Sequence, residues 1–286
     1  MKKCAIVINT YKEEAAAIAG DLQKFLSERN YLTELFPLER ELADYDFSGC
    51  NFAVTLGGDG TVLYAARHCA PLSIPVFPIN LGQFGFIAGI SKTAWQEKLS
   101  LFLDDNLPLA ERSLIQVCVR RQCASGKKGA DVFNSTALND AVIKVAGAAQ
   151  IAELSVSCND EPFGHIRSDG VVVATPTGST AYSAAAGGPI VDPDLDVLVF
   201  SPICPFSLSS RPIVMHQSAR IEIQVLPSRG AKLLLSCDGQ RVFPLEEDDI
   251  IEIRRADTTV QLAGCDSKVF YTALKSKLNW SGGPHA

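Results

Sequence analysis

The chain contains no apolar run that approaches the ~20 residues needed to cross a bilayer. A short apolar run within Met1–Asn9 is followed at once by charged residues, which indicates a buried strand and not a signal peptide. Positive charge is also scarce: the net charge is −6, whereas nucleic-acid-binding proteins usually carry a basic excess. The sequence therefore predicts neither a membrane protein nor a nucleic-acid partner.

Motifs for metal binding and for a serine nucleophile are lacking as well. The 4 histidines show no metal-ligand spacing, and no Gly-x-Ser-x-Gly elbow is present. The 9 cysteines are an odd, scattered set, and the closest pair, Cys118 and Cys123, has no second pair or nearby histidine. Unpaired thiols fit a reducing compartment. We therefore expect a cytoplasmic protein without metal ligands of its own.

What is present is a chain of 286 residues, 47% hydrophobic, which is enough for one large or two ordinary domains. Up to about residue 110, strand-like and helix-like runs alternate, which favours a parallel sheet covered by helices. The expected strands are Cys4–Asn9, Tyr31–Phe36, Asn51–Leu56 and Ile74–Asn80, and the expected helices are Glu13–Arg29, Thr61–Cys69 and Ser91–Leu103, with Ser91 as an N-cap.

After Arg112 the pattern changes to short β-like runs separated by Gly, Pro and Asp, which favours a sandwich-like β domain. The expected strands are Ile115–Arg121, Ala141–Val145, Glu153–Cys158, Val171–Ala174, Val197–Phe200, Arg220–Leu226, Lys232–Ser236, Ile250–Arg254 and Thr259–Gly264. Helices are expected near Ser179 and over Tyr271–Lys277. The predicted division is an α/β domain over 1–110, a β-rich domain over 111–270, and a C-terminal helix and tail over 271–286 that can pack back on the first domain.

The most informative stretch is Gly57–Thr61, a glycine-rich turn between a strand and a helix. Its three glycines allow a close backbone approach and positive φ, and amides at the helix start can face phosphate oxygens. Gly57, Gly58, Gly60 and Thr61 are therefore candidate phosphate-binding residues. Asp59 would repel a phosphate unless it binds Mg²⁺ or holds a hydroxyl that attacks phosphorus. An Asp-Gly β-turn is the alternative.

A second glycine loop, Asn80–Phe86, follows the strand that begins at Ile74. Loops leaving neighbouring parallel strands lie on one edge of the sheet, so this loop and Gly57–Thr61 are expected to face one site. Asn80 and Gly82 join the candidate phosphate-binding residues. The alternative is a tight crossover turn at Gly82 and Gly85.

Three further segments are rich in small polar residues. Arg167–Ser183 places hydroxyls, glycines and a tyrosine after a buried strand, which suits the base, ribose and close approach of a nucleotide. A helix cap at Ser179 is its simpler interpretation. In Leu138–Asp140 an amide next to a carboxylate suits a ribose diol or exocyclic amine, with an Asx turn as the alternative. In Ser236–Gln240 the Asp-Gly pair alone would be an ordinary hairpin turn.

Taken in order, these motifs resemble those of the NAD kinases, which phosphorylate NAD to NADP with ATP. The matching segments span nearly the whole chain: Gly57–Thr61, Asn80–Phe86, Ala137–Asp140, Arg167–Gly170, Thr175–Ser183 with Gly187–Pro189, and Asp238–Gln240. The Thr175–Ser183 block is highly specific, whereas the first loop also occurs in lipid kinases and phosphofructokinases. The resemblance implies an α/β N-terminal domain and a C-terminal domain built largely of β-strands.

The resemblance also implies residue roles. Asp59 would be the catalytic acid–base residue. The NAD site would comprise Asp59, Gly60, Asn139, Asp140, Arg167, Asp169, Thr180, Ala181, Tyr182, Ser183, Ala185 and Gln240, with Asn139 and Asp140 at the ribose or adenine and Asp169 towards the nicotinamide half. ATP would bind with Mg²⁺ or another divalent cation. Because the family often shares its site between subunits, a homo-oligomer, either dimer or tetramer, is expected.

The sequence departs from the family at two positions. The family usually has glutamate in place of Asp140 and serine in place of Ala185. The shorter carboxylate is expected to retune affinity, and the missing hydroxyl removes a hydrogen bond typically worth about 0.5–1.5 kcal/mol. Two rival functions remain: a lipid kinase with the same loop, and a non-catalytic NAD(P)-binding sensor. The hydroxyl-rich block argues against the first, and an intact Asp59 argues against the second.

Overall fold

The structure, a computed structural model, describes residues 2–39, 43–82, 85–121, 129–147, 150–228 and 230–278. It forms two compact units. The first holds the described residues up to Arg112 and those from Thr258 onward, and the second is Ser113–Asp257. The expected boundaries at 110 and 270 stay a prediction. The tail, Ser281–Ala286, and Gln83 and Phe84 of the second glycine loop lie outside the described residues.

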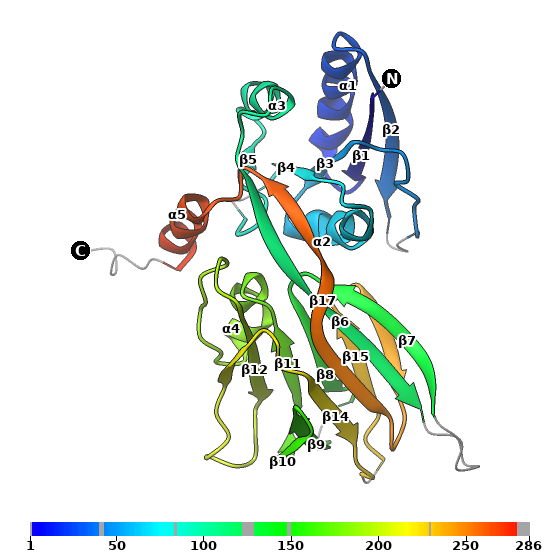
Figure 1. Cartoon of the computed structure of the whole chain (residues 1–286), viewed down its shortest axis with the longest axis vertical. Coiled ribbons are helices and arrows are strands. Elements are labelled where there is room, and N and C mark those ends of the chain that lie inside the picture. Colours follow the sequence, from blue (N-terminus) through cyan, green and yellow to red (C-terminus); the bar gives the residue numbers. More distant parts are fainter. Residues whose placement is uncertain are drawn as a thin grey trace. The chain divides into compact units, whose positions relative to one another are not determined.

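The first unit is built on a parallel sheet covered by helices, which confirms the fold class expected for this part (Figure 1). Its strands run in the order β2 (Tyr31–Leu38), β1 (Lys2–Asn9), β3 (Phe52–Gly57), β4 (Val76–Asn80) and the end of β17 (Ile250–Ala263), with β5 (Ile90–Ser91) also paired to β4. Leu262 of β17 lies opposite Val76 of β4, so the chain returns to this sheet after completing the second unit.

Helices α1 (Glu13–Ser27), α2 (Asp59–Cys69), α3 (Trp95–Leu103) and α5 (Ser267–Leu278) and the 3-10 turn η1 (Ala70–Leu72) complete the first unit. Helix α1 buries Ala15, Ala19, Leu22 and Leu26, which lie on one face at helical spacing, against the strands. The predicted N-cap at Ser91 is wrong. Ser91 lies in β5, its hydroxyl bonds to Thr93, and α3 begins only at Trp95.

The second unit consists of two antiparallel sheets with short helical turns, which confirms the predicted β-rich domain. One sheet contains β10 (Glu161–Ser168), β9 (Ala152–Cys158), β14 (Ile221–Val225) and the start of β17, with β6 (Leu109–Arg121) paired to β17 and to β7 (Ala130–Ala137). The other runs β13 (Ile213–His216), β12 (Val197–Ile203), β11 (Gly170–Ala174), β8 (Asp140–Val145), β15 (Leu233–Cys237) and β16 (Arg241–Leu245). The two strands expected over 250–264 are one continuous strand.

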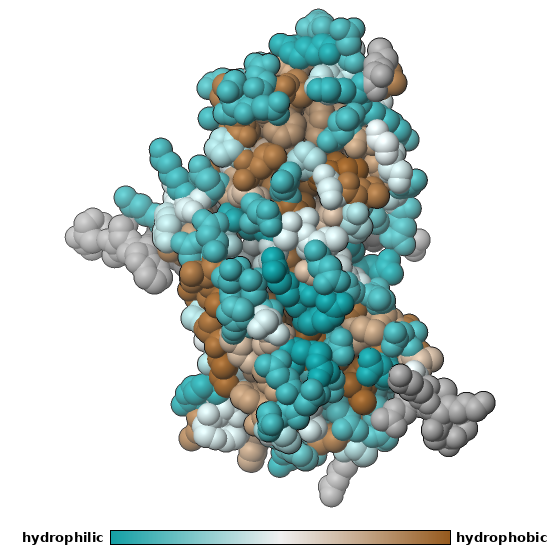
Figure 2. All heavy atoms as spheres, in the orientation of Figure 1, coloured by the Kyte–Doolittle hydropathy of each residue, from teal (hydrophilic) through white to brown (hydrophobic). Residues whose placement is uncertain are grey.

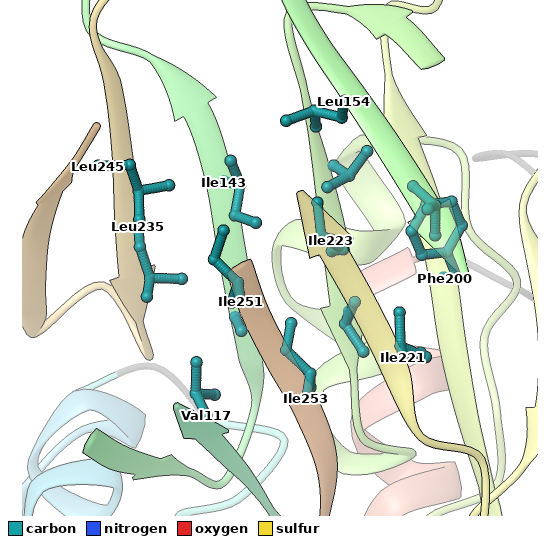
Figure 3. Packing of buried hydrophobic residues seen from close by; sticks show 14 of the residues in the cluster. Val117, Ile143, Leu154, Phe200, Ile221, Ile223, Leu235, Leu245, Ile251 and Ile253 are labelled. Atoms are coloured by element: carbon teal, nitrogen blue, oxygen red, sulfur yellow. The ribbon is translucent and has the colours of Figure 1, made fainter. Parts of the chain in front are cut away.

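The core of the second unit lies between its two sheets. Figure 3 shows Ile143 and Leu235 from one sheet near Ile251 and Ile223 from the other. Along β14, β15 and residues 152–156 of β9 every second residue is buried, as a half-buried strand requires.

Figure 2 shows hydrophilic and hydrophobic residues intermixed on the drawn face of each unit. Within the described ranges, no helix has the length and apolar character needed to span a bilayer.

Candidate functional site

Three parallel strands of the first unit end side by side where the glycine loops begin. β1 ends at Asn9, β3 at Gly57 and β4 at Asn80, and these strands are neighbours in the sheet. The N–H of Leu81 donates to the carbonyl of Gly57 at 2.8 Å, which joins the second loop to the first. Both loops therefore leave the same edge, as the sequence predicted.

The carboxylate of Asp59 is held by the second loop. Asp59 is the first residue of α2, two residues before the expected helix start at Thr61. Its Oδ2 accepts the N–H of Phe86 at 3.0 Å, and its Oδ1 accepts those of Ile87 and Ala88 at 3.2 and 2.9 Å. A carboxylate has about four acceptor positions. These three bonds leave one of them, on Oδ2, for another donor.

The glycines of the first loop act through their size. The positive φ that glycine allows is not used there: Gly58 is extended at φ −120°, and Gly57 and Gly60 have no positive φ either. An ideal Cβ on Gly57 would lie 2.0 Å from Oγ1 of Thr61, so glycine is needed for that contact. An ideal Cβ on Gly58 or Gly60 would meet no atom within 4 Å. No described atom therefore fills the space that a side chain at these two positions would take.

The C-terminal part of the first unit packs against the second loop and the residues that follow it. The Cys265 thiol donates to the carbonyl of Ile87 at 2.9 Å, and burial raises the pKa of this thiol to about 12, so it stays a donor. The rings of Phe86 and Phe270 of α5 lie 6.2 Å apart, and Lys277 of α5 lies over Phe86 at 4.9 Å. These contacts fix the loop that holds Asp59.

In the second unit, Asp238 joins two of the segments that the sequence singled out. Asp238 and Gly239 both have positive φ in the turn between β15 and β16, so the hairpin interpretation is confirmed. The same Asp238 carboxylate accepts the N–H groups of Leu138, Asn139 and Asp140 at 3.0, 2.7 and 3.3 Å. Through these hydrogen bonds the turn also holds the start of β8 in place.

The hydroxyl-rich block packs on the same residues. Thr175 donates its N–H to the carbonyl of Asn139 at 2.9 Å, and an ideal Cβ on Gly178 would lie 1.9 Å from that carbonyl oxygen. Only glycine fits there. The expected helix near Ser179 is a 3-10 turn, η2 (Thr177–Thr180), followed by α4 (Tyr182–Ala185). Ser179 is not a cap, because its buried hydroxyl bonds to the backbone of Val191.

Two buried polar side chains lie at the start of β8, where the Asp238 turn and the hydroxyl-rich block contact it. Asp140 is 4% exposed, and burial together with the nearby charge of Asp238 raises its pKa to about 7, against the opposing N–H of Tyr182. Asn139 is 9% exposed, and its Oδ1 has no hydrogen-bond partner within the described structure. An unfilled acceptor beside a carboxyl that titrates near neutrality is suited to bind a polar ligand.

Two cavities of about 470 Å³ each lie in the second unit and share Lys144 and Tyr182. One is lined by Asn139, Asp140, Val142, Lys144, Ala181, Tyr182, Leu234, Ser236, Asp238, Gly239 and Val242. The other is lined by Lys144, Val145, Gly147, Gln150, Ile151, Asp169, Tyr182 and Ile203. Sequence reasoning missed Lys144, although its two-residue spacing from Val142 and Asp140 places all three on one face of β8.

Other predicted NAD residues line neither cavity. Arg167 pairs with Glu153 at 3.5 Å and lies over the ring of Phe206 at 5.2 Å. Ser183 is fully buried and its hydroxyl bonds to that of Ser201. Thr180 donates to the carbonyl of Thr177, Ala185 is exposed at the end of α4, and Gln240 is half-buried after the Asp238 turn. Their roles stay predictions.

Comparison with known proteins identifies the family. The family models for the ATP-NAD kinase N-terminal and C-terminal domains match residues 38–107 and 138–264. The NAD kinase of Treponema denticola is 44% identical over 99% of this chain and 98% of its own, and that of Treponema pallidum (strain Nichols) is 43% identical over 98% and 90%. The chain belongs to the NAD kinase family. Its enzyme class and NAD kinase function are thereby confirmed, and the lipid-kinase and sensor alternatives are not favoured.

Solved structures of NAD kinase relatives share the fold. A yeast NADH kinase complexed with NADH has a TM-score of 0.83 at 20% identity, covering 99% of this chain and 89% of that one. An NAD kinase from Archaeoglobus fulgidus in complex with ATP has a TM-score of 0.75 at 23% identity, covering 99% and 100%.

Proposed function

We propose that this NAD kinase transfers the γ-phosphoryl of ATP to the 2′-hydroxyl of the adenosine ribose of NAD, with Asp59 as the acid–base residue. The observation that carries this assignment is the Asp59 carboxylate, which three backbone amides orient while one acceptor position remains for a hydroxyl. Gly57, Gly58, Gly60, Thr61, Asn80 and Gly82 at the same edge are the proposed phosphate-binding residues.

Asp59 would act late in the reaction. A carboxylate is too weak a base to ionise a sugar hydroxyl beforehand, so it orients the hydroxyl and takes the proton as the bond to phosphorus forms. The transition state of such transfers is loose, and positioning and charge neutralisation do most of the work. The fixed position of Asp59 supports the positioning part of this role.

A divalent cation such as Mg²⁺ would arrive with ATP. No group of three or more His, Cys, Asp or Glu side chains placed to hold a metal occurs among the described residues. Mg²⁺ usually keeps several waters and binds through substrate phosphates with one or two carboxylates, and Asp59 is a carboxylate at this edge. When bound, the ion would reduce the charge repulsion between the phosphates and Asp59.

The two cavities of the second unit are the proposed NAD subsites. Asn139 and Asp140 would hold the ribose or adenine, because they offer an unfilled acceptor and a carboxyl that can donate or accept near neutral pH. Asp169 in the other cavity would face the nicotinamide half, and Tyr182, which both cavities share, would contact both parts. Gly60, Arg167, Thr180, Ala181, Ser183, Ala185 and Gln240 complete the proposed NAD set.

We also propose a cytoplasmic homo-oligomer, either dimer or tetramer. Phe206 and Leu208, between β12 and the edge strand β13, are 72% and 86% exposed, which is unusual for large apolar side chains and supports a protein contact. Figure 2 shows hydrophobic residues on the side of this unit where Figure 1 draws β12. Light scattering at several protein concentrations tests the oligomer, and a monomer at all of them would contradict this proposal.

The cysteines of the described part are free thiols, which supports a reducing compartment such as the cytoplasm.

The first experiment measures NADP formation from NAD, ATP and Mg²⁺ by the purified protein, beside Asp59→Asn. Turnover by the wild type that collapses in the variant is the expected result. Wild-type protein that binds NAD in calorimetry but forms no NADP would contradict the proposed reaction.

A further inference from the structure

Lys12 stands in the turn between β1 and α1, next to the edge where the glycine loops begin. Oδ1 of Asn9 accepts the N–H of Tyr11 at 3.0 Å, and the carbonyl of Asn9 accepts the N–H of Lys12 at 3.1 Å. The carbonyl of Lys12 in turn accepts the N–H of Ala15 at 2.9 Å, in the first turn of α1. The backbone of Lys12 is therefore fixed, while its side chain is exposed.

The ammonium of Lys12 reaches the second glycine loop. An ideal Cβ on Gly82 would lie 3.8 Å from Nζ of Lys12 and 3.8 Å from Oδ1 of Asn80, which itself accepts the N–H of Gly82 at 2.8 Å. The same turn also meets the first loop, since Cβ of Asn9 would lie 3.2 Å from an ideal Cβ on Gly57. Three strand ends thus bring one cation and two glycine loops together.

The charge of Lys12 has no partner carboxylate among the residues that the structure describes. Two other lysines of this unit are paired: Lys92 with Glu14 at 2.5 Å, and Lys3 with Glu34 at 2.5 Å. The glycine next to this ammonium is Gly82, whose ideal Cβ would lie 3.8 Å from Nζ. An ammonium without a partner carboxylate beside a glycine loop is an arrangement that binds phosphate oxygens.

We propose that Lys12 is a donor-binding residue that contacts the polyphosphate of ATP at this edge, an inference that rests on the proposed function. The chain carries a net charge of −6, and Asp59 adds a negative charge beside the phosphates, so a local cation is needed there. Lys12 supplies it from the same unit as both glycine loops. Its flexible side chain presents a compact charge that suits phosphate oxygens without fixing the nucleoside.

The test compares Lys12→Ala and Lys12→Arg with Lys24→Ala, which removes an exposed lysine from the last turn of α1. We expect Lys12→Ala to raise the KM for ATP about tenfold or more, to leave the KM for NAD within twofold, and to melt at the wild-type temperature. Lys12→Arg should retain most of the ATP affinity, and Lys24→Ala should match the wild type.

Calorimetry without NAD separates the phosphates from the nucleoside. Mg²⁺ with ATP and Mg²⁺ with inorganic tripolyphosphate should both bind about tenfold more weakly to Lys12→Ala, because both ligands present the same phosphate chain. Unchanged affinity for both ligands, or an equal rise in the KM for NAD, would overturn the assignment. If the wild type binds tripolyphosphate but forms no NADP, the proposed function fails while the role of Lys12 is still decided by this binding comparison.

Discussion

Oδ1 of Asp59 occupies the space that a side chain on Gly85 would need: an ideal Cβ on Gly85 would lie 2.0 Å from this oxygen. Gly85 does not have a positive φ, so the requirement for glycine comes from close approach and not from backbone conformation. The N–H of the next residue, Phe86, donates to Oδ2 of the same carboxylate at 3.0 Å. The second loop is therefore shaped around the proposed catalytic carboxylate.

Gly85→Ala tests this relationship directly. The added methyl must displace the Asp59 carboxylate, and a shift of about 1 Å in a reacting group can cost about 100-fold in rate. We expect kcat to fall by about that factor in steady-state assays. Gly20→Ala is the matched control, because a Cβ there meets no atom within 4 Å and alanine favours a helix by about 1 kcal/mol. Full activity in Gly85→Ala would show that the carboxylate need not stay in this position.

Asp59→Asn separates the chemistry from the fold. Losing the proton acceptor should lower kcat by about 10²–10⁴-fold. An amide has one oxygen where the carboxylate has two, so the N–H of Phe86, Ile87 or Ala88 loses its acceptor, at about 1–3 kcal/mol. Kinetics and urea unfolding measure the two effects, with the exposed Glu97→Gln as the control. Near-normal turnover would remove Asp59 from the chemistry.

Asp140 should make stability depend on pH. Burial and Asp238 raise its folded-state pKa from 3.8 to about 7, so the folded protein holds this proton more tightly than the unfolded chain. This contribution to stability is fully present below about pH 4 and is lost as the pH rises through about 7. Asp140→Asn should flatten the profile over this range.

At pH 8 the Asp140→Asn protein should be more stable than the wild type, by at most about 4 kcal/mol at about 1.4 kcal/mol per pKa unit. Urea unfolding between pH 4 and 8 measures the change, and Glu161→Gln, at an exposed site of the same unit, should leave the profile unaltered. A wild-type profile in Asp140→Asn would assign the titration to another group.

Asp238→Asn should shift the same titration downward. The charge of Asp238 is the second cause of the raised pKa of Asp140, after burial, so neutralising it should lower that pKa but leave it above 3.8. The variant should also lose about 1–3 kcal/mol of stability, because one oxygen cannot replace two in accepting the N–H groups of residues 138–140. An NMR titration of the Asp140 carboxyl checks the first effect, and an unchanged midpoint would contradict the charge coupling.

Strands with buried apolar alternation could be predicted from the sequence, whereas strands held by their neighbours could not. β9, β14 and β15 alternate buried and half-buried residues and were expected within one or two residues. β10 contains Pro162 and a register shift beside Gly164, and β16 contains Pro244, so local propensity argues against both. Their pairing with β9 and β15 makes them strands.

Some residues of the candidate site could likewise be predicted from the sequence, and others could not. Glycines, hydroxyls and lone carboxylates in a fixed order were enough to indicate a nucleotide kinase and to single out Asp59, Asn139 and Asp140. The family resemblance added Asp169. Lys12 and Lys144 carry no local signal, because a lysine in a turn or on a strand is common. Ser183 stays a predicted NAD residue, and only the structure showed that its hydroxyl bonds to that of Ser201.

The amino-acid sequence alone determined the family, the two kinds of domain and the chemical groups available to the reaction, since these depend on residue type and order. Only the tertiary structure decided which groups meet. The bonds from Phe86, Ile87 and Ala88 to Asp59 join residues 27 to 29 apart, and those from residues 138–140 to Asp238 join residues 98 to 100 apart. Such contacts depend on packing between distant segments, which local patterns do not encode. So does the pKa of Asp140, which burial and the charge of Asp238 raise.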